Sequence, residues 1–505
     1  MKINYELRIT NYETTFCVAN YEPASNRASL RLGLRVAISW FAALIVHVSL
    51  AQTKEITILA VNDMHAAIER FPKFAALVDS MRTVYPKLLL FSAGDSRTGN
   101  PVNDMHKGPL YPVTALMNKT GFNLSVLGNH EFDGDLEALR DVVNHSTFRH
   151  VCANMVAPDS LRLHIEPYKI FEIEGVRIAV LGLIHQAENG LPDSHPDKMK
   201  NLTFCPPLEA AKKYGWLRYL SDVFILLVHD DHVSNIQLAN QYPLADVLIS
   251  GHSHIRIDST DLHNHVLITQ AAAYLRYVTH ITLQLTDGKI THKEARLLDI
   301  NAFSQINDEV QAMVDDFSNN ETLHRVLTEA ITDFDNKEAL GCMLTDAIRI
   351  ESGADIAFQN TGGVRRPTYP KGPLTVAAVY QFDPFGNEVI LFELTGEEVL
   401  RLIETAYLVD NKSAPFVSGI TYGMELDKQK KIKKLQVKMA DGTPLDLQCT
   451  YKVVMNSYMA AVCRFEKADK GHSLFRTTAE LTIQYLEKQP AVDYNGVKRV
   501  RIIEN

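Results

Sequence analysis

Paired cysteines, positive charge and long apolar runs are scarce in this sequence, and each scarcity excludes a class of protein. The chain of 505 residues has six cysteines and no Cys-x-x-Cys pair, so neither a disulfide framework nor a thiolate zinc site is predicted. The net charge is −9, which leaves no basic surplus to neutralise a nucleic-acid polymer. An acidic protein can still bind an anionic substrate if metal ions supply local positive charge.

The most apolar stretch lies near the start of the chain, at residues 36–50, and is short for a helix that spans a bilayer. Arg27, Arg31 and Arg35 precede it, and small residues follow it just before position 52. This order predicts a secretory signal peptide, with a retained membrane anchor as the alternative. We therefore expect residues 1–52 to be a leader and signal peptide, and the protein to be exported to the periplasm or outside the cell, with no stable membrane span after cleavage.

Length and composition predict a globular protein with more than one domain. Apolar residues make up 46% and charged residues 22%, as in soluble globular chains. A chain this long exceeds one hydrophobic core. We expect a first domain at residues 54–300, a linker helix region at 301–335 and a second, smaller α/β domain at 336–505.

The first domain alternates short apolar runs with helical patterns such as residues 71–84. This alternation predicts a layered α/β fold, in which ligands sit beyond the carboxyl ends of the strands. The strand-like runs are residues 55–61, 88–91, 122–127, 176–183, 224–228 and 246–250.

Metal-ligating residue types follow five of these runs. Each one alone is more simply explained as a helix cap or a solvated turn, but strand ends of a common sheet face one edge, so together they predict a site. The candidates are Asp63, His65, Asp95, Asn129, His130, His229, His252 and His254.

The spacing of these residues predicts a pair of metal ions. In an extended segment, residues i and i+2 point the same way, so Asp63 and His65 could reach one ion. Asp95 stands alone on its loop and could bridge two ions. Mixed nitrogen and oxygen ligands favour zinc, manganese or iron over calcium. Two such ions can activate a hydroxide and clamp a phosphoryl oxygen.

The second domain has three loops with polar and aromatic residues. Gly362 and Gly363 separate Asn360 from Arg365, which suits a loop that closely approaches a phosphate; an ordinary glycine turn is the alternative. Phe385 lies on a tight turn, and Tyr458 follows a strand-like run at residues 451–455. These rings could stack on a base, or they could simply pack between loops.

The order of these motifs closely resembles that of the calcineurin-like metallophosphatases, and residues 55 to about 480 resemble their secreted bacterial 5′-nucleotidase branch. The resemblance implies a layered β-sandwich domain flanked by helices, followed by a substrate-binding domain. It also implies the ligand sets. One metal would be held by Asp63, His65 and His254, the other by Asn129, His229 and His252, with Asp95 shared.

The same resemblance implies the remaining roles. His130 would donate to the phosphate or the leaving oxygen, and Asp133 would orient it. Asn100 would contact the phosphate near the metals. The second domain would contribute Asn360 and Arg365 on the phosphate side, and Phe385 and Tyr458 around the base.

Two departures from the family pattern concern the substrate rather than the metals. Arg464 stands where the family usually has an Asp that binds ribose, and residues 339–342 lack an Arg that some nucleotidases use for phosphate. His229 lies in His-Asp-Asp rather than His-x-Gly, which leaves the ligand itself intact, and Asp230 and Asp231 are expected in a polar turn.

We therefore expect a phosphohydrolase with two divalent metal ions that acts on nucleoside 5′-monophosphates through a metal-activated hydroxide. A 2′,3′-cyclic nucleotide phosphodiesterase, a nucleotide-sugar hydrolase and another phosphomonoesterase remain alternatives. A nucleotide-binding protein without activity is the alternative outside the enzymes.

Overall fold

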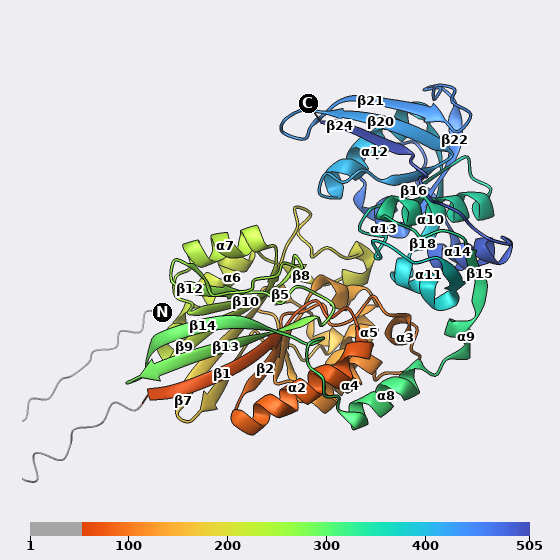
Figure 1. The fold of residues 1–505 in the computed structure, drawn as a ribbon. Helices are drawn as coiled ribbons and strands as arrows, with labels where there is room; N and C mark the ends of the chain where they lie inside the picture. The colour runs from red at the N-terminus through yellow and green to blue at the C-terminus, as the bar shows by residue number, and fades with distance from the viewer. Residues whose placement is uncertain (1–52, 505) are drawn as a thin grey trace, which may run out of the picture. The chain divides into compact units, whose positions relative to one another are not determined.

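The computed structural model of the protein describes residues 53–504. The predicted leader and signal peptide lie outside this range. Within it, no helix combines the length and the apolar character that crossing a membrane requires. Residues from Thr53 onward belong to one unit, whose elements are drawn in Figure 1.

The first sheet contains the strands that lead to Asp63, Asp95 and Asn129. β1 to β4 run parallel, and β13 joins β1 antiparallel, with Ile58 opposite Ile281. The order is β14 (Lys289–Asp299), β13 (Tyr277–Thr286), β1 (Thr53–Val61), β2 (Leu89–Ser92), β3 (Leu124–Val126) and β4 (Arg149–Val151).

The second sheet contains the strands that lead to His229 and His252. β7, β9, β10 and β12 are parallel neighbours, so their carboxyl ends share one edge. The order is β11 (Asp261–His263), β12 (Val266–Thr269), β10 (Val247–His252), β9 (Val223–Asp230), β7 (Val176–Ile184) and β6 (Tyr168–Ile173), with β5 (Met155–Val156) and β8 (Thr203–Phe204) as a separate pair.

The two sheets pack face to face between two layers of helices. Ile58 of β1 and Ile225 of β9 belong to the core between the sheets, whereas Leu59 faces the helices, so the strand is apolar on both faces. Figure 1 shows α2 and α4 along one outer face and α6 and α7 along the other. The helices are η1 (Ile68–Arg70), α2 (Phe71–Val84), α3 (Pro101–Asp104), α4 (Pro112–Thr120), η2 (Asn129–Phe132), α5 (Leu136–His145), η3 (Asp159–Leu161), η4 (Pro196–Met199), α6 (Pro207–Lys213), η5 (Gly215–Leu220) and α7 (His232–Gln241).

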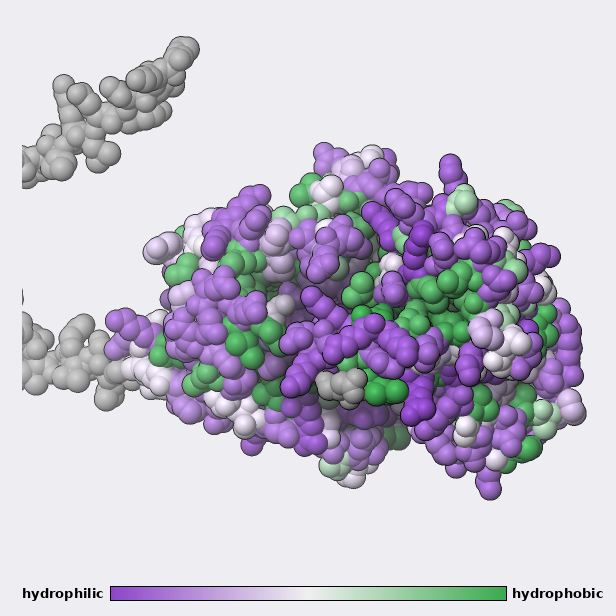
Figure 2. All heavy atoms as spheres, turned by 90° about the horizontal axis from the view of Figure 1, so that it is seen from above, coloured by the Kyte–Doolittle hydropathy of each residue, from purple (hydrophilic) through white to green (hydrophobic). Residues whose placement is uncertain are grey.

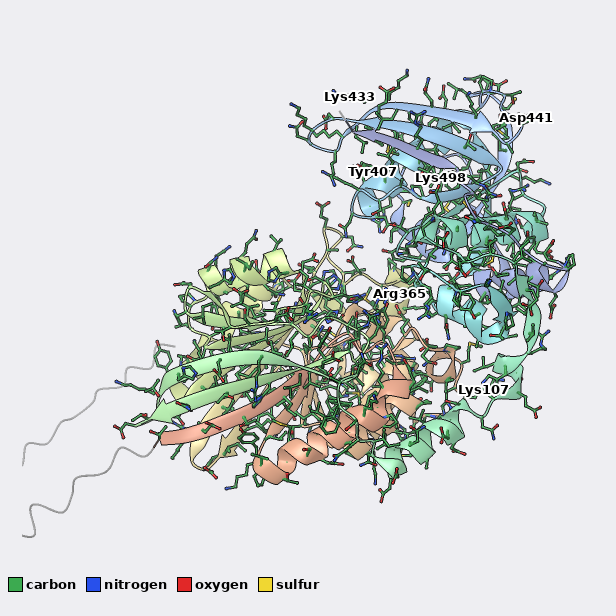
Figure 3. All side chains as sticks on the ribbon, in the orientation of Figure 1. Lys107, Arg365, Tyr407, Lys433, Asp441 and Lys498 are labelled. Carbon is green, nitrogen blue, oxygen red and sulfur yellow. The ribbon has the colours of Figure 1, made fainter. Side chains whose placement is uncertain are left out.

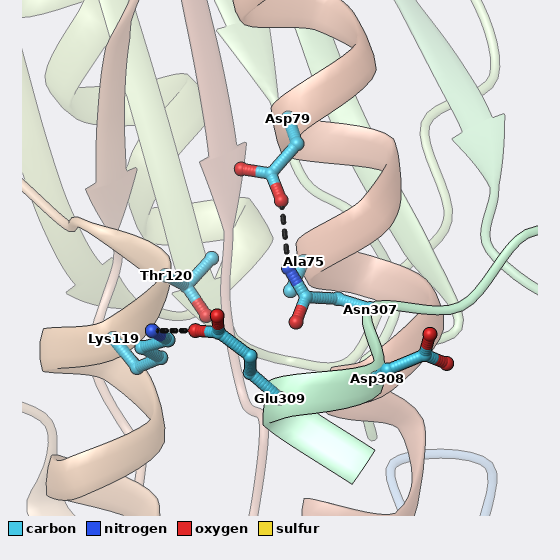
Figure 4. A pocket seen from close by; sticks show the side chains of 7 residues that line it. All are labelled: Ala75, Asp79, Lys119, Thr120, Asn307, Asp308 and Glu309. Carbon is cyan, nitrogen blue, oxygen red and sulfur yellow. Dashed lines mark hydrogen bonds and ion pairs between the residues drawn. The ribbon is translucent and has the colours of Figure 1, made fainter.

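The region predicted as a linker of helices is only partly helical. α8 (Asp308–Ser318) and α9 (Glu321–His324) are present, but β15 (Val326–Ala330) follows and pairs with β17 (Gly372–Thr375). The extended segment begins where the acidic helical pattern gives way to Val326-Leu-Thr, residues that favour strands. Figure 4 shows how the start of α8 is attached: Asn307 binds Asp79 of α2, and Glu309 forms an ion pair with Lys119 of α4.

The C-terminal layers are built on a five-stranded sheet. α10 and α14 pack on one side of it, and α12 and α13 pack on the other. The strands are β19 (Phe416–Ser418), β16 (Ile356–Gln359), β22 (Thr450–Asn456), β18 (Glu388–Thr395) and β23 (His472–Thr477). The helices are α10 (Lys337–Ser352), α11 (Val376–Phe382), α12 (Gly396–Val409), α13 (Ser457–Val462) and α14 (Thr478–Glu487).

A three-stranded sheet completes the C-terminal layers, in the order β21 (Ile432–Met439), β20 (Ile420–Leu426) and β24 (Val500–Glu504). β21 is an edge strand with exposed Lys433, labelled in Figure 3, as well as Lys434 and Lys438. Hydrophilic residues also cover much of the face drawn in Figure 2, with smaller hydrophobic areas between them. The fold is therefore α/β, with a layered β-sandwich first and a smaller α/β part after it, as predicted.

Candidate metal and phosphate site

Seven candidate ligands meet where the carboxyl ends of the two sheets come together. The first sheet brings Asp63 after β1, Asp95 after β2 and Asn129 after β3. The second brings His229 within β9 and His252 at the end of β10. The site is thus shared by two sheets rather than by one common edge.

The first group of donor atoms belongs to Asp63, His65 and His254. The Nε2 atoms of His65 and His254 are 3.0 Å apart, and His254 Nε2 lies 3.4 Å from Asp63 Oδ1. Donors bound to one ion at about 2.1 Å lie roughly 3.0 to 3.4 Å from one another. The spacing therefore fits a shared ion.

The second group belongs to Asp95, Asn129, His229 and His252. His229 Nε2 lies 3.2 Å from Asp95 Oδ2 and 3.1 Å from Asn129 Oδ1. His252 Nδ1 lies 3.0 Å from the same Asn129 oxygen. Two imidazoles, one carboxylate and one amide oxygen form the mixed donor set that suits a borderline first-row metal.

Two of the histidines are held in the tautomer that a metal requires. Nδ1 of His65 donates to the Thr98 carbonyl at 3.0 Å, and Nδ1 of His229 donates to the Ala93 carbonyl at 2.7 Å. A carbonyl only accepts, so each Nδ1 carries a proton, and Nε2 is the atom that faces the site and would bind a metal in its deprotonated form.

The charges of the site also favour a cation. Burial alone would lower the pKa of His229, but Asp95 outweighs burial and raises it to about 10. Asp63 and Asp95 are almost completely buried, at 0% and 2% exposure. Buried carboxylates that hold a proton on a neighbouring imidazole provide the negative potential that a divalent ion can neutralise instead. The residues present therefore fit metal binding.

The backbone at these ligands is not extended. The prediction that Asp63 and His65 reach one ion because they alternate along an extended segment is therefore wrong in its reason. The φ angles of Asp63, His65 and Asp95 are +47°, +46° and +51°, and those of His252 and His254 are +78° and +56°. Such left-handed residues are strained by about 1 kcal/mol or more each, and they cluster at functional sites. Asp63 and His65 converge through two left-handed turns, not through strand alternation.

Glu131 holds the Asp95 loop in place, a role that the sequence did not reveal although the residue directly follows Asn129 and His130. Its carboxylate accepts hydrogen bonds from the backbone N–H of Asp95 at 2.9 Å, Ser96 at 2.8 Å and Gly128 at 2.6 Å. A Cβ on Gly128 would lie 2.1 Å from Asp95 Oδ1, so only glycine allows this approach.

His130 and Asp133 form the expected pair beside the ligands. His130 Nδ1 lies 2.6 Å from Asp133 Oδ2, and His130 Nε2 lies 3.8 Å from Asp95 Oδ2. Burial would lower the pKa of His130, but Asp133 and Asp95 outweigh it and raise the pKa. The protonated form of the imidazole is thus favoured, and the ring is oriented so that Nε2 can donate.

A cavity of about 820 Å³ opens in front of this pair. Arg365, labelled in Figure 3, reaches across it, and its Nη2 lies 3.0 Å from His65 Nε2. The ring of Phe385 stacks on His130, with centroids 5.9 Å apart and planes at 27°. Candidate residues that line the cavity are Asn129, His130, Asp133, His252, Asn360, Gly362, Gly363, Arg365, Phe385 and Tyr458.

Asn100 and Arg464, the two positions that the family pattern relates to the phosphate and the ribose, lie outside the cavity lining. Asn100 caps α3, where its Oδ1 accepts from the Val102 N–H at 3.0 Å and its Nδ2 faces Glu69, so its side chain is committed to the helix start. Arg464, which stands at the position of the family's ribose-binding Asp, is solvent-exposed. Asp230, which ends β9, and Asp231, at the N-cap position of α7, do line the cavity.

The segment from Asp193 to Lys198 touches the site repeatedly, although no motif in the sequence points to it. Asn129 Nδ2 donates to the Asp193 carbonyl at 3.0 Å, which turns the Asn129 oxygen towards His229 and His252. Ser194 Oγ donates to Asp133 Oδ1 at 3.1 Å. The segment is a short loop that leads into the single 3-10 turn η4 and has no periodic pattern, so only the folded chain reveals it.

Comparisons with known proteins identify the families to which the two parts of the chain are similar. The sequence profile of the calcineurin-like phosphoesterase family matches residues 56–256, and that of the 5′-nucleotidase C-terminal domain matches residues 322–464. Protein UshA of Yersinia enterocolitica is 25% identical, over 93% of this chain and 97% of its own length. The 5′-nucleotidase of Vibrio cholerae is also 25% identical, over 88% of this chain and 92% of its own.

Solved structures share the fold. The 5′-nucleotidase precursor of Thermus thermophilus has a TM-score of 0.77 at 24% identity, over 89% of this chain and 99% of that one. The sulfate thiohydrolase SoxB of the same organism has a TM-score of 0.71 at 17% identity, over 89% and 96%. Since these two differ in activity, the fold alone does not choose the substrate. By its two matching profiles and its relatives, the chain belongs to the calcineurin-like phosphoesterases with a 5′-nucleotidase C-terminal domain, and it is a metal-dependent phosphoric ester hydrolase.

Proposed function

We propose that this enzyme removes phosphate from nucleoside 5′-monophosphates with the help of two divalent ions of the zinc, manganese or iron type. The observation that carries the proposal is the convergence of seven donor side chains beside a cavity that also contains Arg365 and Phe385. One ion would be held by Asp63, His65 and His254. The other would be held by Asn129, His229 and His252, and Asp95 would bind both ions. When bound, such ions supply Lewis-acid charge to a phosphoryl oxygen and activate water.

The residues of the chain would position the ester and transfer a proton. The Arg365 guanidinium would grip two phosphate oxygens, because its planar fork matches them, and Asn360 would add a neutral contact. His130 would donate its Nε2 proton to the oxygen on which charge develops, while Asp133 fixes the ring from the Nδ1 side. Asp133 itself is fixed by Ser194 and so cannot turn away.

The organic part of the substrate would lie between Phe385 and Tyr458. Both rings line the same cavity, and a base stacked on an aromatic ring gains about 1 to 3 kcal/mol. The name of one relative, the 5′-nucleotidase of Vibrio cholerae, supports the same substrate class. Because Arg464 is exposed, ribose recognition would depend on other residues of the cavity.

Organisation and location are part of the proposal. Residues 54–300 would form the metallophosphatase domain and residues 336–505 the substrate-binding domain, joined by residues 301–335. The signal-peptide pattern in residues 1–52 supports export to the periplasm or beyond.

Metal content and turnover of AMP, measured before and after chelation, test this function. We expect about two divalent ions per chain, loss of activity on chelation, and recovery with manganese or zinc. The kcat/KM for AMP should be higher than the values for ribose 5-phosphate, a 2′,3′-cyclic nucleotide and a nucleotide-sugar. An equal rate on AMP and ribose 5-phosphate would reject the nucleotide preference, and full activity without metal would reject the site.

A further inference from the structure

We propose that Lys198 is a positioning residue that joins the proton-donating loop to the aromatic loop, and so makes phosphate cleavage depend on the presence of a base. The inference deepens the proposed function and rests on it, because it assumes that Phe385 supports the base of a nucleotide.

Lys198 bridges two main-chain carbonyls that belong to different parts of the cavity. Its Nζ donates a hydrogen bond to the Asp133 carbonyl and another to the Phe385 carbonyl, the latter at 3.3 Å. Residues 133 and 385 are far apart in sequence, on the loop after β3 and on the turn before β18. One ammonium group thus holds both loops at a fixed separation.

The two loops that Lys198 joins also touch through their side chains. Asp133 binds the His130 ring on its Nδ1 side, and the Phe385 ring stacks on the same imidazole. A shift of the Phe385 turn would therefore move the surface against which His130 rests. Since proton transfer depends on positioning within fractions of an ångström, fixing this contact affects turnover as well as binding.

The surroundings of Lys198 suit a fixed link rather than a surface charge. Within residues 53–504 no carboxylate lies close enough to Lys198 for an ion pair, so the two carbonyls are its partners. Burial lowers the pKa of Lys198, and the nearby Asp133 carboxylate opposes the shift. An ammonium with three donors can serve two acceptors at once, which an apolar side chain of equal length cannot do.

The rest of the segment strengthens the link. Ser194 donates to the free oxygen of Asp133, and His195, which precedes η4, contacts the Ser457 backbone next to Tyr458. A stretch of six residues therefore reaches the proton donor and both aromatic loops. The expected consequence is that a base held by Phe385 and Tyr458 improves the position of His130.

The test compares AMP with ribose 5-phosphate, which carries the same phosphate but no base. In Lys198→Met, kcat/KM for AMP should fall about tenfold, close to the effect of one charge-assisted hydrogen bond, while the value for ribose 5-phosphate changes less than about twofold. Lys200→Met is the matched control: Lys200 is two residues away, 72% exposed and paired with Asp197, so both substrates should be unaffected.

A double-mutant cycle separates coupling from simple loss of contact. In a Phe385→Ala background, Lys198→Met should cause little further loss on AMP, because the ring through which it acts is gone. Lys198→Arg, which keeps the charge and the donors, should recover part of the preference for AMP. Lys198→Gln replaces the methionine variant if thermal unfolding shows that the latter does not fold.

Each outcome is decisive. Equal losses on both substrates, no loss on either, or additive losses in the cycle would overturn the role of Lys198. Failure of the proposed function itself is seen separately, because the wild-type enzyme would then show no preference for AMP over ribose 5-phosphate.

Discussion

The metal-side cluster and the aromatic loops of the cavity are constructed in opposite ways. Asp63, Asp95 and His229 are buried, and their loops are tied by backbone hydrogen bonds, with both aspartates held in left-handed conformations. Phe385 and Tyr458 are only partly buried; Phe385 lies on a turn, and Tyr458 lies in the first turn of α13 rather than on the predicted loop. The ring of Phe385 stacks on His130, and the backbone carbonyl of Phe385 accepts a hydrogen bond from Lys198. The difference indicates that the chemistry of ester cleavage is fixed by rigid local structure, whereas the choice of ester depends on a few adjustable contacts.

The largest effect that this comparison predicts is at Asp95. Asp95→Asn should lower kcat/KM for every phosphate ester at least about 10³-fold and reduce the bound metal, because a buried carboxylate shared by both donor groups is lost. Metal analysis and steady-state kinetics measure this. Asp287→Asn, in the exposed turn after β13, is the control and should change neither. Retained metal and a loss below tenfold would show that the rigid cluster is not the site of cleavage.

A smaller effect is expected at His130. His130→Ala should reduce kcat by about 10²- to 10³-fold on AMP and ribose 5-phosphate alike, since positioned proton donation contributes about this much. Metal content should remain that of the wild type, because His130 is not one of the seven proposed ligands. His145→Ala, at the end of α5, is the matched control. A loss confined to AMP would instead assign His130 to base recognition.

Phe385 tests the adjustable side of the comparison. Phe385→Ala should lower kcat/KM for AMP by about tenfold and leave ribose 5-phosphate nearly unchanged, because the lost stacking is worth about 1 to 3 kcal/mol and involves only the base. The control is Phe475→Ala, whose ring is 86% exposed. A comparable loss on the sugar phosphate would mean that the ring serves the phosphate side through His130.

The smallest effect on turnover is expected at Asp383, two residues before Phe385. Burial raises the pKa of this carboxyl to about 6, and its bond from Thr478 opposes the shift. The folded state therefore binds the proton more tightly than the unfolded chain, whose pKa is about 3.9. The stabilisation that Asp383 contributes to the free energy of unfolding should thus fall by about 3 kcal/mol in total as the pH rises from about 3 to 7, and show no further loss above that.

Urea unfolding of the wild type and Asp383→Asn at several pH values measures this dependence. The free energy of unfolding of Asp383→Asn should rise relative to that of the wild type as the pH increases through this window. A difference that is constant with pH would show that Asp383 does not titrate there. Activity on AMP should change less than about threefold, since Asp383 does not line the cavity.

The elements that could be predicted from sequence are those whose own residues show whether they are buried strands or the loops that follow them. The apolar runs that became β1, β2, β7, β9 and β10 were identifiable because strands buried on both faces contain little else. The polar residues after them were identifiable as a site because the strands end together. The fold class and the gathering of candidate ligands followed from these two facts.

The rest depends on long-range contacts that leave no local pattern. The left-handed conformations of Asp63 and His65 are set by hydrogen bonds to the Asp95 loop. The spacing of these residues in the sequence does not predict such conformations. Asp193 lies in a loop and Lys198 in the short 3-10 turn η4 that follows it, and their partners are up to 187 residues away. β15 was included in a helical region because its partner β17 lies further along the chain, beyond α10 and β16, so its pairing is invisible in the local sequence.

The lysines of β21 have a consequence for how copies of this protein meet. Lys433, Lys434 and Lys438 lie on β21, an edge strand at the margin of its sheet that pairs with β20 on its inner side and with residues 443–445 at its C-terminal end. On the rest of its outer side, a strand from a second copy could otherwise add through backbone hydrogen bonds. An approaching copy of the same strand would set ammonium against ammonium. Self-association through this margin is thereby opposed even in a chain whose overall charge is negative.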